Sequence, residues 1–360
     1  MIRRLRTALL VLFLLALALA ALAWHLTWHP EPHAGVAPAC QGTPPTLHPG
    51  QPVTAMTWNV QFLAGKRYLF WYDAPQGRSH DASPSAEDVA HDLDEVVRVI
   101  RDEQPDLVLL QELDDGAKAT SYQNQLALLQ QRLVDLYPCS VEAFDWKAEF
   151  VPQPDIFGSV GRKLAILSRY RIGQAERWQL PREGGWLNLF GRRQVLLAAY
   201  LPIAPDQHLA VLNTRLAPYR HDDTTQARQL QAVAARVDRL EALGTPWLLG
   251  GDFNLLPLGQ YRRLPLGQQS QYSPEDDLHL LWDRYPMIPS NAAAGGEDRA
   301  QWFTHFPFDA SGPDRTLDYL VHSPRLTSLN ARVRQEDTLG ISDHLPLSGR
   351  FLLPAQEKKP

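Results

Sequence analysis

Five apolar runs of the chain end in side chains that carry oxygen or imidazole donors. The endings are Asn59, Gln111-Glu112, Asn213-Thr214, Asp252 with Asn254, and Ser342-Asp343-His344. Carboxylates and carboxamides are hard oxygen ligands, which suit Mg²⁺ or Mn²⁺ better than zinc or iron. One polar strand end is ordinary. Five such endings predict a shared site, because ligands bind beyond strand ends in α/β folds.

The dipeptide Asp343-His344 adds an acid–base group to these oxygen donors. A histidine oriented by a carboxylate can act as a general base, and a metal ion neutralises the charge that develops on a phosphate. The motifs G-x-x-x-x-G-K-[ST] and G-x-S-x-G do not occur, so neither nucleotide-dependent phosphoryl transfer nor a serine nucleophile is indicated. The chemistry that these residues predict is metal-assisted hydrolysis of a phosphoester.

Short strands interspersed with helices must position these residues. Ser85 and Asp88 predict a capped helix that Pro105 closes, and 107–110 is typical of a strand buried on both faces. The other expected strands are 53–60, 164–167, 195–201, 208–212, 247–249, 317–321 and 348–352, and the other expected helices are 123–136 and 225–243. This order indicates the α/β class with mixed sheets.

Six short motifs follow one another along residues 57–347. They are TWNVQFL (57–63), LLQEL (109–113), LAILSRY (164–170), GGDFN (250–254), RTLDYLV (315–321) and SDHLPL (342–347). Each is weak alone, but in this order they resemble the endonuclease/exonuclease/phosphatase superfamily of deoxyribonuclease I-like, metal-dependent phosphoesterases. The resemblance implies a four-layer α/β/β/α sandwich, in which two packed mixed β-sheets are flanked by helices.

The resemblance also implies a metal site. Glu112 would be the direct ligand of Mg²⁺ (or Mn²⁺), and Asn59 and Asp343 would complete that end of the site.

The same resemblance implies four catalytic residues. Asp252 would orient or deprotonate the attacking water, and Asn254 would hydrogen-bond the scissile phosphate. His344 would polarise the phosphate or accept the proton, with Asp318 fixing its tautomer. Asp252 and Asn254 lie two apart on an expected strand, so they would point to one side, and the preceding glycines would let the backbone approach the substrate.

One motif departs from the family pattern. The family usually has N-T-H-L where this chain has 213–216, Asn-Thr-Arg-Leu, and the acidic partner of that histidine is replaced within 161–163, Gly-Arg-Lys. An arginine stays charged and cannot shuttle a proton, but it can clamp a phosphate through two hydrogen bonds. Arg215 and Lys163 are therefore candidate phosphate-binding residues, and a salt bridge on the rim is the alternative interpretation of Arg215.

The N-terminus is typical of an export signal. Arg3, Arg4 and Arg6 precede an uncharged run at 8–24, which predicts a signal peptide or an N-terminal membrane anchor over 1–24. Because the arginines stay on the cytoplasmic side, the rest of the chain would face outward. The expected organisation continues with a Pro-, His- and Gly-rich linker at 25–52, one catalytic domain at 53–353 and a tail at 354–360.

Charge and cysteine content narrow the function. The net charge is −5 overall and +2 over residues 1–50, hence −7 over the remainder, which argues against non-specific coating of DNA. Cys40 and Cys139 could pair in an oxidising compartment, but two cysteines make no disulfide framework.

The leading hypothesis is a monomeric phosphodiesterase or phosphatase that acts on a lipid or small phosphoester. It would be membrane-anchored or secreted into a periplasmic or extracellular space. The alternatives are an extracytoplasmic nuclease on DNA or RNA and a catalytically impaired phosphate-binding module.

Overall fold

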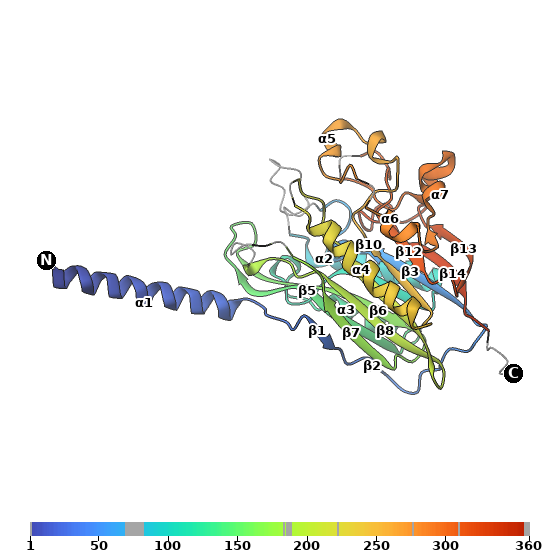
Figure 1. Ribbon diagram of the computed structural model, residues 1–360, viewed down its shortest axis with the longest axis horizontal. Coiled ribbons are helices and arrows are strands. Elements are labelled where there is room, and N and C mark those ends of the chain that lie inside the picture. The colour runs from blue at the N-terminus through green and yellow to red at the C-terminus, as the bar shows by residue number, and fades with distance from the viewer. Residues whose placement is uncertain are drawn as a thin grey trace.

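The computed structural model describes residues 2–68, 83–182, 184, 189–221, 223–275, 277–308 and 310–355. Within these residues the strands form two seven-stranded sheets (Figure 1). In sheet order, the first contains β13 (Thr327–Val333), β14 (Leu347–Leu352), β3 (Pro52–Asn59), β4 (Leu107–Asp114), β6 (Gly158–Ser168), β5 (Cys139–Val151) and β2 (Ala39–Cys40). The second contains β1 (His33–Gly35), β7 (Gln174–Gln179), β8 (Val195–Ala204), β9 (Gln207–Arg215), β10 (Trp247–Asp252), β12 (Asp318–His322) and β11 (Met287–Ile288).

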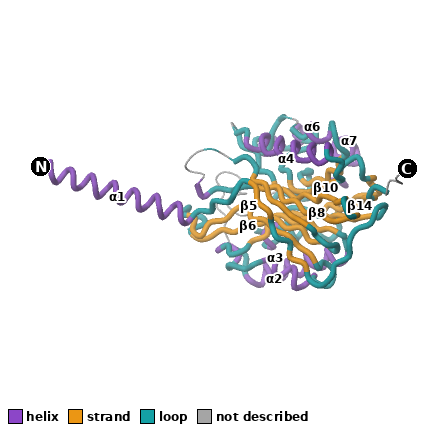
Figure 2. The backbone as a smooth tube through the Cα atoms, turned by 60° about the horizontal axis from the view of Figure 1, so that its bottom comes forward, coloured by secondary structure: helices purple, strands orange, loops and turns teal. Residues whose placement is uncertain are grey.

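Helices cover the outer face of each sheet (Figure 2). The first sheet packs against α2 (Ala86–Glu103) and α3 (Gln125–Leu133), and the second against α4 (Thr225–Ala242) and α6 (His279–Trp282). The remaining helices are α1 (Ile2–Leu26), α5 (Leu266–Gln269) and α7 (Asn291–Gly295). Because β3 pairs with β4 and β9 with β10 in parallel while other pairs are antiparallel, both sheets are mixed. The expected four-layer α/β/β/α sandwich is confirmed.

The helix α2 shows why the sequence pattern succeeds locally. The Ser85 side chain caps the first turn, and the backbone N–H of Ser85 donates to the Asp88 carboxylate, so the expected capping box is present. The apolar stripe from Val89 to Ile100 is buried against the first sheet. The spacing of the apolar residues predicts this helix correctly because one face of the helix must be buried in the core.

The two glycines of GGDFN serve the sheets rather than substrate access. A Cβ on Gly250 would lie 2.9 Å from Leu320 and 3.0 Å from Leu109, which belongs to the opposite sheet. A Cβ on Gly251 would lie 2.0 Å from the backbone oxygen of Thr214. The glycines therefore let β10 approach both its neighbour β9 and the facing sheet, which corrects the expectation that they make room for a substrate.

The expected linker, residues 25–52, lies along the domain instead of spanning free space. β1 pairs with β7, β2 pairs with β5, and a disulfide joins Cys40 to Cys139. These contacts attach the segment to the edges of both sheets. The last residues of the expected tail, 356–360, lie outside the described residues.

The helix α1 extends away from the sandwich in both views (Figures 1 and 2). None of its residues is buried in the protein, and it is long and apolar enough to cross a membrane. A signal sequence, which also lies near an N-terminus, has the same length and composition.

Candidate active site

The site is the polar end of the layer between the two sheets. Each of its strand-borne residues shares a face with inner-core residues such as Leu164, Val211 and Leu248, because alternate residues of a strand point to the same side. These residues are Asn59 of β3, Asp145 of β5, Arg162 of β6, Arg215 of β9, Asp252 of β10 and Asp318 of β12. All six are buried. Sheet pairing makes Arg215 and Asp318 the two cross-strand partners of Asp252.

His344 and Asp318 form a buried hydrogen-bonded pair. His344 Nδ1 lies 2.7 Å from Asp318 Oδ2, and Nε2 points inward, 3.9 Å from Asp252 Oδ2. Burial alone would lower the pKa of His344, but the carboxylates of Asp318 and Asp252 outweigh burial and raise it to about 10. Burial also raises the pKa of Asp318, but the hydrogen bond within the pair favours the charged form of His344, which suits donation of a hydrogen bond better than acceptance of a proton.

Asn59 and Asn254 hold the carboxylate of Asp252. Asn59 Nδ2 donates to Asp252 Oδ2 at 3.2 Å, and Asn254 donates to Asp252 through both its backbone N–H (3.0 Å) and Nδ2 (3.1 Å). Asn254 lies beyond the end of β10, in the left-handed region with φ 52°, and not two places along a strand as the sequence predicts. Asparagine tolerates this conformation, and the turn brings its side chain back to Asp252.

Glu112 enters the site through a bulge in β4. Its pairing with β6 shifts between Leu110 and Leu113, and Glu112 itself has φ 58°. Without the bulge, strict alternation would send Glu112 to the helix-covered face with Leu110. Instead its Oε1 lies 2.5 Å from Arg215 Nη2 and 3.8 Å from Arg162 Nη1.

Arg162 and Lys163, which stand where the family has an acidic residue, point to opposite faces of β6. Arg162 makes a bidentate buried pair with Asp145, with Nη2 to Oδ2 at 2.6 Å and Nε to Oδ1 at 2.9 Å. Lys163 points to the other face of β6, where Nζ pairs with Asp115 at 2.8 Å and with Glu142 at 2.7 Å. The structure thus brings Arg162, and not the candidate Lys163, beside Arg215. Leu164 faces the inner core, and residues two apart on a strand point to the same side, so this alternation would have selected Arg162 from the sequence.

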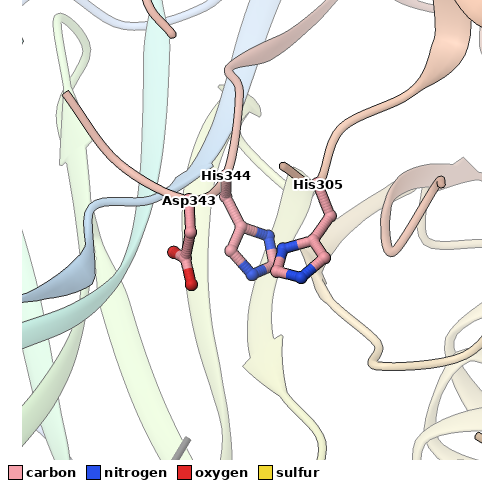
Figure 3. A group of neighbouring side chains, drawn as sticks. All are labelled: His305, Asp343 and His344. Atoms are coloured by element: carbon pink, nitrogen blue, oxygen red, sulfur yellow. The ribbon is translucent and has the colours of Figure 1, made fainter. Parts of the chain in front are cut away.

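Asp343 and His305 are half-buried and lie on either side of His344 (Figure 3). The rings of His305 and His344 have centroids 4.7 Å apart, and Figure 3 shows the Asp343 carboxylate on the other side of the His344 ring. Burial lowers the pKa of His305 well below its usual range, and His344 lowers it further, so His305 is neutral. The sequence did not predict His305 as a site residue, because it belongs to no recognisable motif. It did not predict Asp145, because the strand β5 that carries it was not predicted.

Two groups of described residues place acid and imidazole atoms closely enough to share a metal ion. They are His305, Asp343 and His344, and Asp252, Asp318 and His344. Neither includes Glu112, whose carboxylate contacts Arg215. The carboxylates and the amide of Asn59 nevertheless offer the hard oxygen atoms that Mg²⁺ or Mn²⁺ prefers, so the donor chemistry fits such an ion.

The raised pKa of His344 predicts how stability depends on pH. An imidazolium favoured in the folded state stabilises fully below the unfolded pKa of about 6.5. This contribution is lost as pH rises towards about 10. We expect the difference in unfolding free energy between wild type and His344→Gln to shrink steadily from pH 6.5 to 10, measured by thermal denaturation. A difference that stays constant or grows with pH would contradict the assigned charge.

The fold and the site define a class: a two-sheet α/β sandwich with a histidine–aspartate pair, two further carboxylates and asparagines at one end of the sheets. The sequence profile described as Endonuclease/Exonuclease/phosphatase family matches residues 56–344, and the chain belongs to this family. Its members are typically hydrolytic phosphoesterases that generally use divalent metals. No curated protein matches the sequence.

Solved structures with the same fold are distant in sequence. An endonuclease/exonuclease/phosphatase from Beutenbergia cavernae has 21% identity and a TM-score of 0.57, covering 84% of this chain and 72% of that one. The human Nocturnin catalytic domain with bound sulfate has 17% identity and a TM-score of 0.53, covering 84% and 94%. Truncated TDP2 of Caenorhabditis elegans has 17% identity and a TM-score of 0.51, covering 84% and 98%. At these identities the likeness shows the fold alone.

Proposed function

We propose that the chain is a divalent-metal-dependent phosphoester hydrolase that acts outside the cytoplasm. The observation that carries the proposal is the position of His344: Asp318 holds Nδ1, while Nε2 faces the buried carboxylate of Asp252. This places a proton donor opposite a proton acceptor across one small space. Hydrolysis of a phosphoester needs this arrangement, because charge develops on the phosphate while water loses a proton.

Each side chain has a defined part in the proposed reaction. Asp252 accepts the proton of the attacking water, and the two asparagines hold its carboxylate in place. His344 donates a hydrogen bond to a phosphate oxygen, and Asp318 keeps its ring oriented. Asn254 Nδ2 also donates to Leu216 O at 3.0 Å, so in this arrangement Asn254 positions Asp252, and it must release one partner to reach a phosphate.

A divalent ion, when bound, supplies charge neutralisation at the phosphate. Glu112 would be its direct ligand, with Asn59 and Asp343 completing the site.

The N-terminal segment supports a location outside the cytoplasm. α1 has the length and composition of a membrane span or signal, and a disulfide between Cys40 and Cys139 suits an oxidising compartment. The residue after α1, Thr27, bridges to Ala148 of β5, which pairs with Val160 of β6. Val160 is two residues from Arg162, so the base of α1 adjoins the end of the sheets that carries the site. An uncleaved α1 would hold this end towards the bilayer, which favours a phosphoester at the membrane surface.

The full chain in detergent provides the test of metal dependence. We expect hydrolysis of bis(4-nitrophenyl) phosphate in Mg²⁺, loss of turnover with excess EDTA and recovery when Mg²⁺ is added back, because the carboxylates that would hold the ion are all in the site. Turnover that persists in EDTA would contradict metal dependence. No turnover, combined with unimpaired binding of inorganic phosphate, would instead identify a phosphate-binding module.

A substrate panel distinguishes the remaining possibilities. We expect phospholipid in the vesicles that hold the chain to be hydrolysed faster than the same phospholipid in separate vesicles. Cleavage of single-stranded DNA or RNA without attack on either lipid pool would support the nuclease alternative and overturn the assignment to a membrane phosphoester.

A further inference from the structure

Arg215 contacts both carboxylates that a metal-dependent hydrolase would use. It is the last residue of β9, and its Nη2 lies 2.5 Å from Glu112 Oε1 while its Nε lies 3.2 Å from Asp252 Oδ2. The side chains of Arg215 and Glu112 are 5% and 3% exposed. A guanidinium stays charged at any physiological pH, so this contact is a fixed buried ion pair and not a surface salt bridge.

A second arginine, Arg162, also lies near Glu112, but it is paired with a different carboxylate. Arg162 is held by two hydrogen bonds from Nε and Nη2 to Asp145, and its Nη1 lies 3.8 Å from the Glu112 oxygen that Arg215 contacts. Asp145 therefore compensates Arg162. Glu112 and Asp252 compensate Arg215, so the cation that neutralises Glu112 in this structure is Arg215.

A divalent ion bound by either oxygen of the Glu112 carboxylate would lie close to the Arg215 guanidinium, whose Nη2 is 2.5 Å from Oε1. Two cations that close repel strongly, most of all where burial excludes water. A bound ion and the Arg215–Glu112 contact therefore each weaken the other.

We propose that Arg215 is a built-in competitor of the divalent metal for Glu112, so that the metal binds tightly only when the guanidinium moves away. The proposal rests on the metal site of the proposed function, but it concerns the affinity of that site and not the reaction. A displaced guanidinium needs another anion, and a phosphate that enters beside His344 offers two oxygens for a bidentate contact.

Metal affinity measured without turnover tests the proposal. The full chain in detergent is stripped with chelator and titrated with Mn²⁺ by calorimetry at pH 8. We expect Arg215→Met, which keeps a similar length without charge, to bind Mn²⁺ at least about tenfold more tightly than wild type, equivalent to about 1.4 kcal/mol. Arg215→Lys keeps the charge and should bind much like wild type. Arg177→Met removes a buried arginine that contacts Glu31 O and Trp28, away from Glu112, and should change nothing.

The outcomes separate this proposal from the proposed function. Equal or weaker Mn²⁺ binding by Arg215→Met than by wild type overturns the competition, and the metal site survives. Absence of Mn²⁺ binding in every variant overturns the metal site itself. Adding Glu112→Gln to Arg215→Met should abolish the gain, and a gain that persists would place the ion elsewhere and overturn the proposal. If Arg215→Met does not fold without metal, Arg215→Gln, which also removes the charge but keeps polar atoms for Glu112 and Asp252, replaces it.

Discussion

Replacing His344 by glutamine is expected to lower kcat for bis(4-nitrophenyl) phosphate by about 10²–10⁴-fold, with a much smaller change in KM. Glutamine retains a hydrogen-bond donor but not the positive charge that Asp318 and Asp252 impose on the imidazole. The charge matters most in the transition state, where the phosphate gains negative charge, so the loss should be in kcat. Steady-state release of 4-nitrophenol from the full chain in Mg²⁺ gives both constants.

His208→Gln is the matched control for this prediction. His208 is exposed at the start of β9, at the opposite end of that strand from Arg215, and its replacement should leave both constants unchanged. If His344→Gln retained more than about a tenth of the wild-type kcat, His344 would not carry the expected share of a general acid–base step. The proposed division of roles between His344 and Asp252 would then be wrong.

Asp145→Ala is expected to destabilise the protein by about 3–5 kcal/mol, because it leaves the charge of Arg162 buried without its partner. Both side chains of this pair are 1% exposed. A water molecule in the vacated space would lack the carboxylate's charge, and Glu112 lies too far, at 3.8 Å, to make a comparable hydrogen bond. Unfolding of the full chain in detergent, followed by circular dichroism in urea, measures the change.

Two further variants make this stability prediction specific. Asp135→Ala breaks the exposed pair with Arg101, whose side chains are 56% and 42% exposed, and should cost about 0–1 kcal/mol. Asp145→Leu combined with Arg162→Met removes both buried charges and should recover much of the loss. If Asp145→Ala and Asp135→Ala lowered the free energy of unfolding equally, the buried charge of Arg162 would not depend on Asp145 for compensation.

The elements that the sequence predicted well share one property: each buries a continuous apolar face. The helix α2 and the strands β4, β8, β9 and β10 contain the expected residues, and α4 ends one residue before its expected end. By contrast β5, the longest strand, was not predicted. Its sequence CSVEAFDWKAEFV mixes charged and apolar residues, and its register with β6 shifts twice, so simple alternation does not describe it.

The short edge strands were also not predicted, for a different reason. β1 and β2 come from a segment rich in proline, histidine and glycine, which has no propensity of its own for strand formation. They form because the edges of β7 and β5 supply hydrogen-bond partners, and the Cys40–Cys139 disulfide holds the segment there.

The amino-acid sequence by itself determined the family, the layered α/β architecture and which strand ends carry oxygen and imidazole groups. The α/β class and the polar strand ends follow from residue type and from the apolar periodicity that burial imposes on each element, while the family and its layered architecture were implied by the resemblance of six motifs in order. Whether those side chains would share one pocket depended on how the strands pair.

Three features of the pocket required the folded chain. A bulge in β4 turns Glu112 inward, strand register sends Arg162 and not Lys163 to the site, and sheet order places Arg215 between Glu112 and Asp252. Each depends on pairing between segments far apart in sequence, and a shift of one residue in that pairing moves a side chain to the opposite face. Local patterns contain no information about such a shift, so the charge balance at Glu112 is a property of the tertiary structure alone.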